Sequence, residues 1–291
     1  MDELGRVGRM TPSAEPQDRP DLGAVRLVAV DVDGTLLTTN HQVTPATVAA
    51  VHEAREHGIE VVLTTSRPPP ALRPILERLG LVDPAEFIGS QGAMTGAYAA
   101  DGRLREVARR PMAREPALVT VRAALRAGLA ASWFSGEAWL VTHVDAQVRR
   151  EARIVGCEPV VADLTAEQEG PEKLLVIAPD GEVEVLAALT GALPAGVHAQ
   201  TSNPTYLEIT RADVDKASAL RALCRRRGIE RTEVAAIGDG MNDLPMLAFA
   251  RLAIAPANAR PAVVAQADLL VPSNDEDGVA HALRRLVRAG A

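Results

Sequence analysis

Aromatic residues and cysteines are scarce in this chain, which has three Phe, two Trp and two Tyr among 291 residues. No Lys/Arg stripe is interleaved with aromatic rings and the net charge is −7, so we expect no nucleic-acid partner. No apolar run approaches the roughly 18–20 residues that span a membrane, so we expect no membrane partner. The two cysteines, Cys157 and Cys224, form no metal-ligand pattern and indicate no oxidising compartment, which favours a cytoplasmic location.

The composition is otherwise that of an ordinary globular protein, with 47% hydrophobic and 24% charged residues. The chain is long enough for one large domain or two modest ones. Residues 1–22 are polar, contain prolines and lack an apolar core. They predict a disordered lead, or an upstream start with Met10 as the true beginning, and neither a signal peptide nor an anchor. The run Arg225–Arg227 follows an expected helix, where basic residues complement the helix dipole.

The most informative segment is Asp31–Leu37 (DVDGTLL), in which two acids follow an apolar run. The run Val25–Val30 predicts a buried strand of a parallel sheet, and Gly34 breaks it. Asp31 and Asp33 therefore belong at the carboxyl end of that strand, where ligands bind in open α/β sheets. Acids so close repel each other unless a cation or a shared proton relieves them. The segment thus indicates a nucleophile, a proton donor and a metal site in one turn.

Two plainer interpretations compete with this one. An Asp-Gly turn after a strand is ordinary loop chemistry. A calcium-binding loop also begins with Asp-x-Asp, but it requires glycine at the sixth and glutamate at the twelfth position. Counted from Asp31, those positions hold Leu36 and Gln42, so the spacing excludes the EF-hand and leaves the turn as the alternative.

Strands and helices alternate at both ends of the chain and are interrupted by a differently patterned insert. Residues 23–92 and 211–291 predict a Rossmann-like α/β core with a parallel sheet, in which Thr44 and Pro45 start the first helix. Residues 93–210 predict an inserted α+β cap domain, an antiparallel sheet with helices on one face. Its expected elements are a hairpin around 101–102, helices near 115–127, 145–155 and 181–190, and strands near 129–144, 158–163, 173–178 and 197–210.

A second acidic segment, Gly238–Asp243 (GDGMND), follows the apolar strand 234–237. Alone it is a helix entry, but if the two strand ends face each other the four aspartates form one cluster. Neither nucleotide-binding glycine pattern is present. Such a cluster suits Mg²⁺, a hard cation held by carboxylates and phosphate oxygens. A carboxylate can then attack phosphorus, and a second one can protonate the leaving alkoxide.

The two segments together resemble the haloacid dehalogenase superfamily, specifically its Cof-type phosphatases with a type IIB cap. The resemblance covers nearly everything after residue 24, including Asn258 and the segment Asn274–Val279 (NDEDGV). It implies a phosphoric monoester hydrolase. Such an enzyme would be a Mg²⁺-dependent phosphatase that acts on small phosphorylated metabolites, such as sugar or cofactor phosphates, through an aspartyl-phosphate.

The resemblance also implies catalytic and metal-binding roles. Asp31 would be the nucleophile, Asp33 would protonate the leaving group and later activate water, and Lys216 would neutralise the nucleophile and the phosphate. Mg²⁺ would be held by Asp31, the backbone carbonyl of Asp33, and Asp239. Asp243 would hold a metal-bound water or act as a further ligand.

Substrate contacts follow from the same resemblance. Thr65 occupies the phosphate-binding hydroxyl position, Asn242 would contact phosphate or substrate, and Gly34 and Arg67 are further substrate-binding candidates. Three positions depart from the family pattern, namely Ser66 and Ala217, where glycine is usual, and Gln91, where asparagine is usual. None of these departures touches the aspartates.

Most of the aromatic residues fall within the insert. They are Tyr98, Trp133, Phe134, Trp139 and Tyr206. They either line a substrate pocket facing the aspartates or, as we favour, pack the core of a small cap. Trp133 and Phe134 are adjacent on an expected strand, so they point to opposite faces and at most one joins the helix-facing core. His143, Lys173 and Arg211 are weaker candidates for substrate contact.

Other functions are open or disfavoured to different degrees. A phosphomutase of the same chemistry would return the phosphoryl group to a second hydroxyl, and the sequence does not exclude it. A non-catalytic metabolite-binding protein on the same scaffold would need no nucleophile beside an acid. Dehalogenation would leave Asp33 no oxygen to protonate, and an ion-pumping ATPase needs membrane spans. The sequence carries no indication of the oligomeric state.

Overall fold

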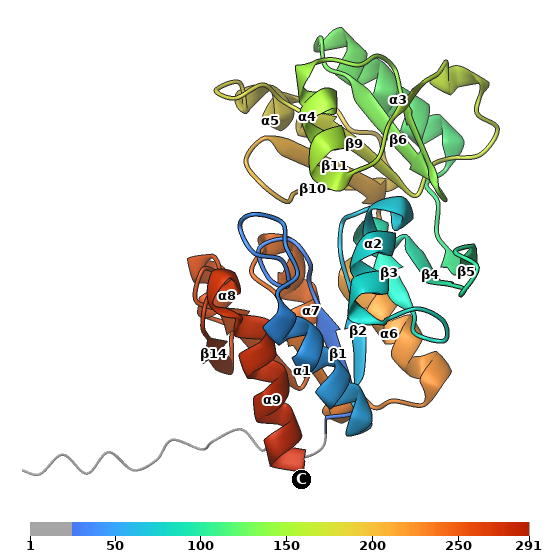
Figure 1. Ribbon diagram of the computed structural model, residues 1–291. Helices are drawn as coiled ribbons and strands as arrows, with labels where there is room; N and C mark the ends of the chain where they lie inside the picture. Colours follow the sequence, from blue (N-terminus) through green and yellow to red (C-terminus); the bar gives the residue numbers. More distant parts are fainter. Residues whose placement is uncertain (1–24, 291) are drawn as a thin grey trace, which may run out of the picture.

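The computed structural model describes residues 25–290, so the expected disordered lead of residues 1–22 lies outside the described residues. Figure 1 shows two bodies, a lower one built around a parallel sheet and an upper one built around a second sheet. The lower sheet has the strand order β14-β13-β12-β1-β2, and its registered pairs are all parallel. Its strands are β1 (Leu27–Val30), β2 (Glu60–Leu63), β12 (Val234–Ile237), β13 (Leu252–Pro256) and β14 (Leu269–Val271).

Helices cover both faces of this sheet, as the unbroken apolar runs predict for a buried parallel sheet. Val28 and Val30 pack with α1, α2 and α9 on one face, whereas Leu27 and Ala29 pack with α6, α7 and α8 on the other. The predicted α/β core is therefore present. These helices are α1 (Pro45–Glu56), α2 (Pro69–Leu79), α6 (Lys216–Arg227), α7 (Leu244–Phe249), α8 (Pro261–Val264) and α9 (Gly278–Gly290).

Two helix starts show how local sequence sets these boundaries. Thr44 caps α1, because its hydroxyl accepts a hydrogen bond from the backbone N–H of Thr47 at 3.1 Å, and Pro45 follows at the first helical position. Asp215 caps α6 in the same way and accepts from the N–H of Ser218 at 2.6 Å. The second cap places Lys216 in the first turn of α6, at the end of the helix that faces the site.

The strand that follows α2 departs from the expected pattern. β3 (Phe87–Gly89) pairs antiparallel with β4 (Met94–Tyr98), which pairs with β5 (Leu104–Arg109), in a separate three-stranded sheet. A single bridge between Thr64 and Ile88 connects β3 to the end of β2. The predicted boundary at residues 92–93 thus divides this small sheet, because β3 lies before it and the hairpin after it.

The upper body contains a six-stranded sheet with the order β10-β11-β9-β6-β7-β8. Its pairs are antiparallel, as expected, except that β8 runs parallel to β7. The hairpin β6–β7 turns at Gly136. The elements are β6 (Ala131–Ser135), β7 (Ala138–Val141), β8 (Val160–Val161), β9 (Lys173–Ile177), β10 (Val197–Thr201), β11 (Tyr206–Arg211), α3 (Arg114–Arg126), α4 (Ala146–Val155) and α5 (Glu184–Gly191).

Helices cover both faces of the cap sheet, so the expectation that they lie on one face was wrong. Trp133 packs with α3 and α5, whereas Phe134 and Trp139 pack with α4 on the opposite face. The two adjacent residues of β6 do point to opposite faces, as predicted, but each meets a helix. The reason is that α4 has its own apolar stripe, and that stripe covers the face turned toward the core.

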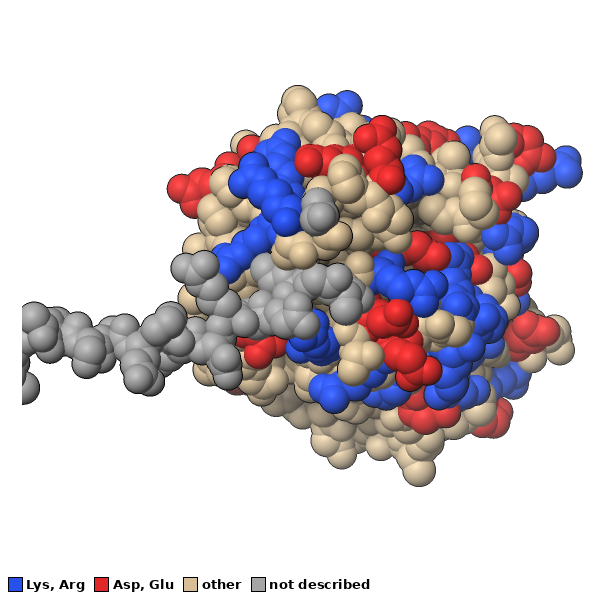
Figure 2. Space-filling model, turned by 90° about the horizontal axis from the view of Figure 1, so that it is seen from below, with Lys and Arg blue, Asp and Glu red and all other residues tan. Residues whose placement is uncertain are grey.

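Ion pairs occupy the basic run at the end of α6. Arg227 pairs with Glu60 at 2.7 Å and Arg226 pairs with Glu86, which leaves the run in ordinary surface contacts. Figure 2 shows basic and acidic side chains close together on the face of the core seen from below. Within residues 25–290, no helix has the length and apolar character needed to cross a membrane.

Candidate active site

The two acidic segments meet at one edge of the core sheet. β1 and β12 are neighbours with Val30 opposite Ile237, and parallel neighbours end at the same edge. Carboxylate oxygens of Asp31, Asp239 and Asp243 lie within 4.8 Å of one another. The structure thus brings three of the four predicted aspartates together, whereas the carboxylate of Asp33 points elsewhere.

Lys216 joins two of these aspartates across the molecule. Its ammonium donates hydrogen bonds to Asp31 Oδ1 at 2.5 Å and to Asp243 Oδ1 at 2.6 Å, and its side chain is fully buried. Burial alone would lower the pKa of Lys216, but the two carboxylates raise it above its ordinary value. The lysine is therefore a permanent positive charge next to Asp31.

One lysine does not neutralise three carboxylates, and the pKa values show the remaining repulsion. Burial, followed by the charge of Asp243, raises the pKa of Asp31 well above its ordinary value despite Lys216. The same two causes raise the pKa of Asp239 to about 6. Hard carboxylate oxygens with excess negative charge form the kind of donor set that Mg²⁺ takes. The residues present fit a divalent cation.

Gly34 leaves room for this cluster. A Cβ atom at Gly34 would lie 2.6 Å from Asp239 Oδ2, and the residue has a φ of +81°, so both space and backbone require glycine. Next to it, the hydroxyl of Thr35 donates a hydrogen bond to Asp239 Oδ1 at 2.7 Å. Asn258 donates to the carbonyl of Gly34 at 2.7 Å and ties the turn to the C-terminal part of the core. The turn is thus fixed from both sides.

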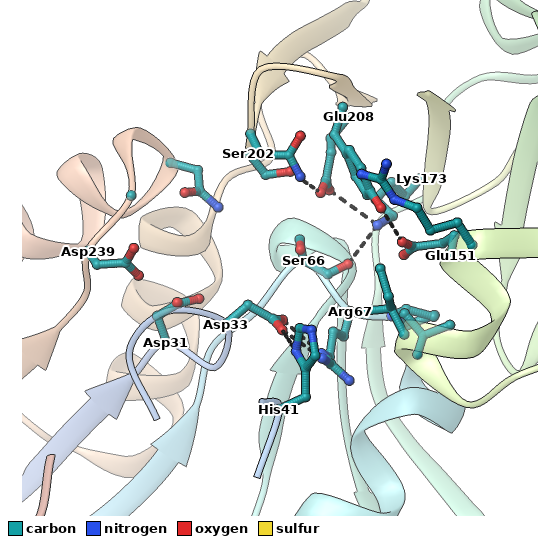
Figure 3. A pocket seen from close by; sticks show the side chains of 18 residues that line it. Asp31, Asp33, His41, Ser66, Arg67, Glu151, Lys173, Ser202, Glu208 and Asp239 are labelled. Atoms are coloured by element: carbon teal, nitrogen blue, oxygen red, sulfur yellow. Dashed lines mark hydrogen bonds and ion pairs between the residues drawn. The ribbon is translucent and has the colours of Figure 1, made fainter. Parts of the chain in front are cut away.

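Asp33 forms a bidentate ion pair with Arg67. The guanidinium donates from Nε and Nη2 to the two carboxylate oxygens at 2.7 and 2.6 Å (Figure 3). His41 Nδ1 lies 3.7 Å from Asp33 Oδ1. Burial raises the pKa of Asp33, but the hydrogen bonds of Arg67 and His41 outweigh it and lower the pKa well below its usual range. The ion pair therefore favours the ionised form of Asp33.

The other predicted substrate contacts lie around this centre. Thr65 is buried, and its hydroxyl accepts a hydrogen bond from the backbone N–H of Arg67 at 3.1 Å. Asn242 lines the cavity and donates to Gln91 Oε1 at 3.4 Å. Gln91 is buried with a left-handed backbone, and its own amide nitrogen has no partner within the described structure. Its contact with Asn242 shows that this departure from the family pattern still reaches the site.

A cavity of about 280 Å³ lies above these residues, between the core and the cap. Asp31, Asp33 and Asp239 line it from the core. The cap residues that line it include Glu151, Lys173, Ser202 and Glu208, which are labelled in Figure 3, and also Tyr206. The cavity is thus walled by charged and hydroxyl groups on both sides.

Lys173 connects the cap to the core. Its ammonium donates to the backbone carbonyl of Ser66 at 2.7 Å and pairs with Glu208 at 3.2 Å, while it lies 4.8 Å from the ring centre of Phe134. The hydroxyl of Ser202 donates to the second oxygen of Glu208 at 2.9 Å. This buried network holds the cap over the acidic cluster. Of the three weaker candidates from the sequence, Lys173 lines the cavity, and His143 and Arg211 lie outside its lining.

Trp133, Phe134 and Trp139 pack the core of the cap, as we favoured, and Phe134 stacks on Trp139 with ring centres 5.4 Å apart. For Tyr98 the expectation was wrong, because it packs with the core sheet and stacks on Phe87 with ring centres 5.8 Å apart. Tyr206 packs in the cap and also lines the cavity.

Several residues of the site were missed from the sequence. These are Thr35, His41, Glu151, Ser202 and Glu208. A signal existed for two of them. Glu151 occupies an apolar stripe of α4 between Val148 and Val155, and Glu208 interrupts the buried strand β11. Buried acids on apolar faces are uncommon without a partner or a function.

Comparisons with known proteins agree with this geometry. A family model of haloacid dehalogenase-like hydrolases matches residues 28–283. YxeH of Bacillus subtilis is 29% identical over 276 residues, which cover 91% of this chain and 99% of the relative. Pyridoxal phosphate phosphatase YbhA of Escherichia coli is 26% identical over 268 residues, 88% of this chain and 96% of that one. A solved haloacid dehalogenase-like hydrolase from Bacteroides thetaiotaomicron is 26% identical and superposes with a TM-score of 0.80. The match covers 90% of this chain and 99% of the solved chain.

A strand-end aspartate pair, a buried lysine and an inserted cap are thus found in a chain that the family model covers nearly throughout. The chain belongs to the haloacid dehalogenase-like hydrolases, and within them to the Cof-type phosphatases. The family that the two acidic segments predicted is confirmed.

Proposed function

We propose that the protein is a Mg²⁺-dependent phosphatase that hydrolyses small phosphorylated metabolites, such as sugar or cofactor phosphates, through an aspartyl-phosphate on Asp31. The observation that carries the proposal is the fully buried Lys216, which bridges Asp31 and Asp243 beside Asp239 at one end of the cavity. A purely binding protein has no need of this arrangement. The activity that the name of YbhA states, on a cofactor phosphate, supports the substrate class.

The first half-reaction uses Asp31 and Asp33. Lys216 engages Oδ1 of Asp31, so Oδ2 is the oxygen that attacks phosphorus, and the ester P–O bond breaks. The departing alkoxide takes a proton from Asp33. Asp33 is ionised beside Arg67 before substrate binds, and the negative charge of the incoming phosphate raises its pKa so that it takes up from solvent the proton that it donates.

The second half-reaction releases phosphate. Asp33, now a carboxylate, takes a proton from water, whose oxygen attacks the phosphorus and displaces the Asp31 carboxylate. Mg²⁺ held by Asp31, Asp239, the backbone carbonyl of Asp33 and, directly or through water, Asp243 would neutralise the phosphate oxygens during both steps. Thr65, Asn242, Gly34 and Arg67 are the proposed contacts to phosphate and substrate.

The cavity sets the size of the substrate. A volume of about 280 Å³ suits a small metabolite, and the cap covers the reacting atoms. Closure of the cap would exclude bulk water and strengthen the electrostatic interactions inside. The proposed location is the cytoplasm, because the two cysteines indicate no oxidising compartment.

The test measures phosphate release from a panel of phosphomonoesters by the wild type and Asp31→Asn, each with Mg²⁺ or with EDTA. We expect turnover that requires Mg²⁺ and is lost in the variant. Arg26→Met serves as the control and should keep the activity. It removes an exposed ion pair with Glu233 at the amino ends of β1 and β12, opposite the ends that carry the aspartates.

The outcomes separate the alternatives. Isomerised ester without free phosphate would indicate a phosphomutase. Ester binding without any turnover would indicate a metabolite-binding protein. Turnover that persists in Asp31→Asn would overturn the assignment of the nucleophile.

A further inference from the structure

Glu151 is a buried acid on the cap side of the cavity. It lies on α4, its residue is 8% exposed, and it lines the cavity that contains Asp31 and Asp33. Its Oε2 accepts one hydrogen bond, from the hydroxyl of Tyr206 at 2.6 Å. Figure 3 shows its carboxylate close to the side of the cavity that Arg67 borders.

No cation of the described chain forms a direct ion pair with Glu151. The charges of Lys173 and Arg67 act on it from a greater distance, and the cations near it have other partners in direct contact. Arg67 is held in its bidentate pair with Asp33, to which it donates from Nε and Nη2. Lys173 is held by Glu208 and by the carbonyl of Ser66. Arg150, the neighbour of Glu151 on α4, pairs with Asp180 at 3.2 Å on the surface.

A buried carboxylate without a direct ion pair is costly. Burial raises the pKa of Glu151 and outweighs the hydrogen bond of Tyr206 and the more distant charge of Lys173, which lower it. Removing a carboxylate from water is unfavourable unless an opposite charge or further donors compensate it. A positively charged group on a bound molecule would supply that compensation, as a cation beside an acid favours the ionised form.

The rest of the lining narrows the chemistry of that molecule. Among the described residues that line the cavity, Tyr206 is the only Phe, Trp or Tyr, so there is little surface on which a flat ring could stack. Ser202, Asn203 and Tyr206 offer hydroxyl and amide groups instead, and Pro68, Ile154 and Val155 add only a small aliphatic surface. The walls therefore match a hydrophilic body with several hydrogen-bonding groups.

From this arrangement we propose that the substrate carries a protonated amine on a polyhydroxylated body, and that Glu151 binds this amine while the core binds the phosphate. An amino sugar phosphate has this chemistry. The proposal rests on the proposed function for the phosphate end only. It makes Glu151 a residue that determines specificity.

The test uses matched ester pairs that differ only in an amine. The pairs are glucosamine 6-phosphate with glucose 6-phosphate, glucosamine 1-phosphate with glucose 1-phosphate, and 2-aminoethyl phosphate with 2-hydroxyethyl phosphate. Binding is measured calorimetrically with Mg²⁺ in the Asp31→Asn background, where we expect no turnover, with and without Glu151→Gln. Glutamine at this position still accepts the hydrogen bond of Tyr206, so a change in preference reports the charge.

In at least one pair we expect the aminated ester to bind about 10- to 100-fold more tightly, as for a hydrogen bond to a charged group, and Glu151→Gln to remove that preference. Glu184→Gln, an exposed acid on α5 at the opposite face of the cap sheet, should keep it. Equal affinities within every pair, no binding of any ester, or a preference that survives Glu151→Gln would overturn the proposal. Phosphate release by the wild type is measured separately, so an amine preference without turnover would contradict the phosphatase function alone.

Discussion

Arg67 and Asp33 face each other in a bidentate ion pair, with N···O distances of 2.7 and 2.6 Å. The two residues follow neighbouring strands, β1 and β2, so the pair joins two loops at the same edge of the sheet. It fixes the carboxylate of Asp33 away from the other three aspartates. The ion pair thus separates the proposed proton donor from the proposed metal ligands, because Asp33 is paired with a cation of its own.

Replacing Arg67 should lower the free energy of unfolding by an amount that depends on pH. The pKa of Asp33 is lowered in the folded state, so the pair stabilises the protein above the ordinary aspartate pKa of about 3.9, and the contribution is lost as the pH falls through the lower folded value. Because the Asp33 side chain is 40% exposed, water screens the pair, and we expect Arg67→Met to reduce the free energy of unfolding at pH 7 by about 1 kcal/mol.

Urea unfolding of wild type and variant at pH 7 and at pH 3 measures this difference, which should shrink at the lower pH. Arg73→Met removes an exposed pair with Glu77 and serves as the control for loss of a surface charge. A difference between wild type and Arg67→Met that is the same at both pH values would show that packing, and not the ion pair, is responsible.

Removing Lys216 should be far more costly. Lys216→Met leaves Asp31 and Asp243 buried without their cation, and breaking a buried pair costs about 3–5 kcal/mol. Lys216→Met combined with Asp243→Asn should recover part of this loss, since one of the unpaired charges is then gone. Urea unfolding in EDTA at pH 7 gives the values, and a loss below about 1 kcal/mol for the single variant would contradict the buried pair. Phosphate release should be abolished in both variants.

The metal-free protein should become less stable as the pH rises. Burial and neighbouring charge raise the pKa of Asp31, and that of Asp239 to about 6, so the folded state holds protons that the unfolded chain releases near pH 3.9. The free energy of unfolding in EDTA should therefore fall from about pH 4 to pH 6, by on the order of 2 kcal/mol for Asp239. Asp239→Asn should flatten this slope.

With added Mg²⁺, the free energy of unfolding should instead rise with pH. The cation competes with protons for the same carboxylates, so it binds more tightly as the pH rises and stabilises the folded state more. Urea unfolding at four pH values between 4.5 and 6.5, with EDTA or with Mg²⁺, measures both slopes. Stability that rises with pH in EDTA for wild type would contradict the raised pKa values.

The strand ends were predictable because their partners are set by the sheet. An apolar run that stops at an acid places that acid at the carboxyl edge, and parallel pairing then brings Asp31 and Asp239 together. The helix N-cap residue Asp215 marks the start of α6 and therefore the position of Lys216. The core sheet and its helices follow from the same local patterns.

Contacts made by long side chains across the molecule were not predictable. Arg67 reaches Asp33, and Lys173 reaches the carbonyl of Ser66, because the folded chain brings them within range, and spacing encodes neither contact. The local sequence pattern predicts that β3 is a strand, but it does not predict that β3 pairs with the β4–β5 hairpin and not with the core sheet. The composition also carries a signal. Lys173 and Lys216 are the only two lysines among the 31 Lys and Arg residues, and both are buried at the site.

Gly34→Ala should separate backbone strain from damage to the cluster. The residue has a φ of +81°, and a methyl group there would lie 2.6 Å from Asp239 Oδ2, so alanine must displace that carboxylate. Gly58 is the matched control, because its φ is +78° and no atom lies within 4 Å of its added Cβ. Both substitutions place alanine in the left-handed region, at a cost of about 1–2 kcal/mol. Only Gly34→Ala should also weaken Mg²⁺ binding, by at least about tenfold, because Asp239 loses its position beside Thr35. Urea unfolding in EDTA measures the shared cost, and calorimetric titration with Mg²⁺ measures the difference. Equal Mg²⁺ affinities in the two variants would show that Asp239 is not held where the cation binds.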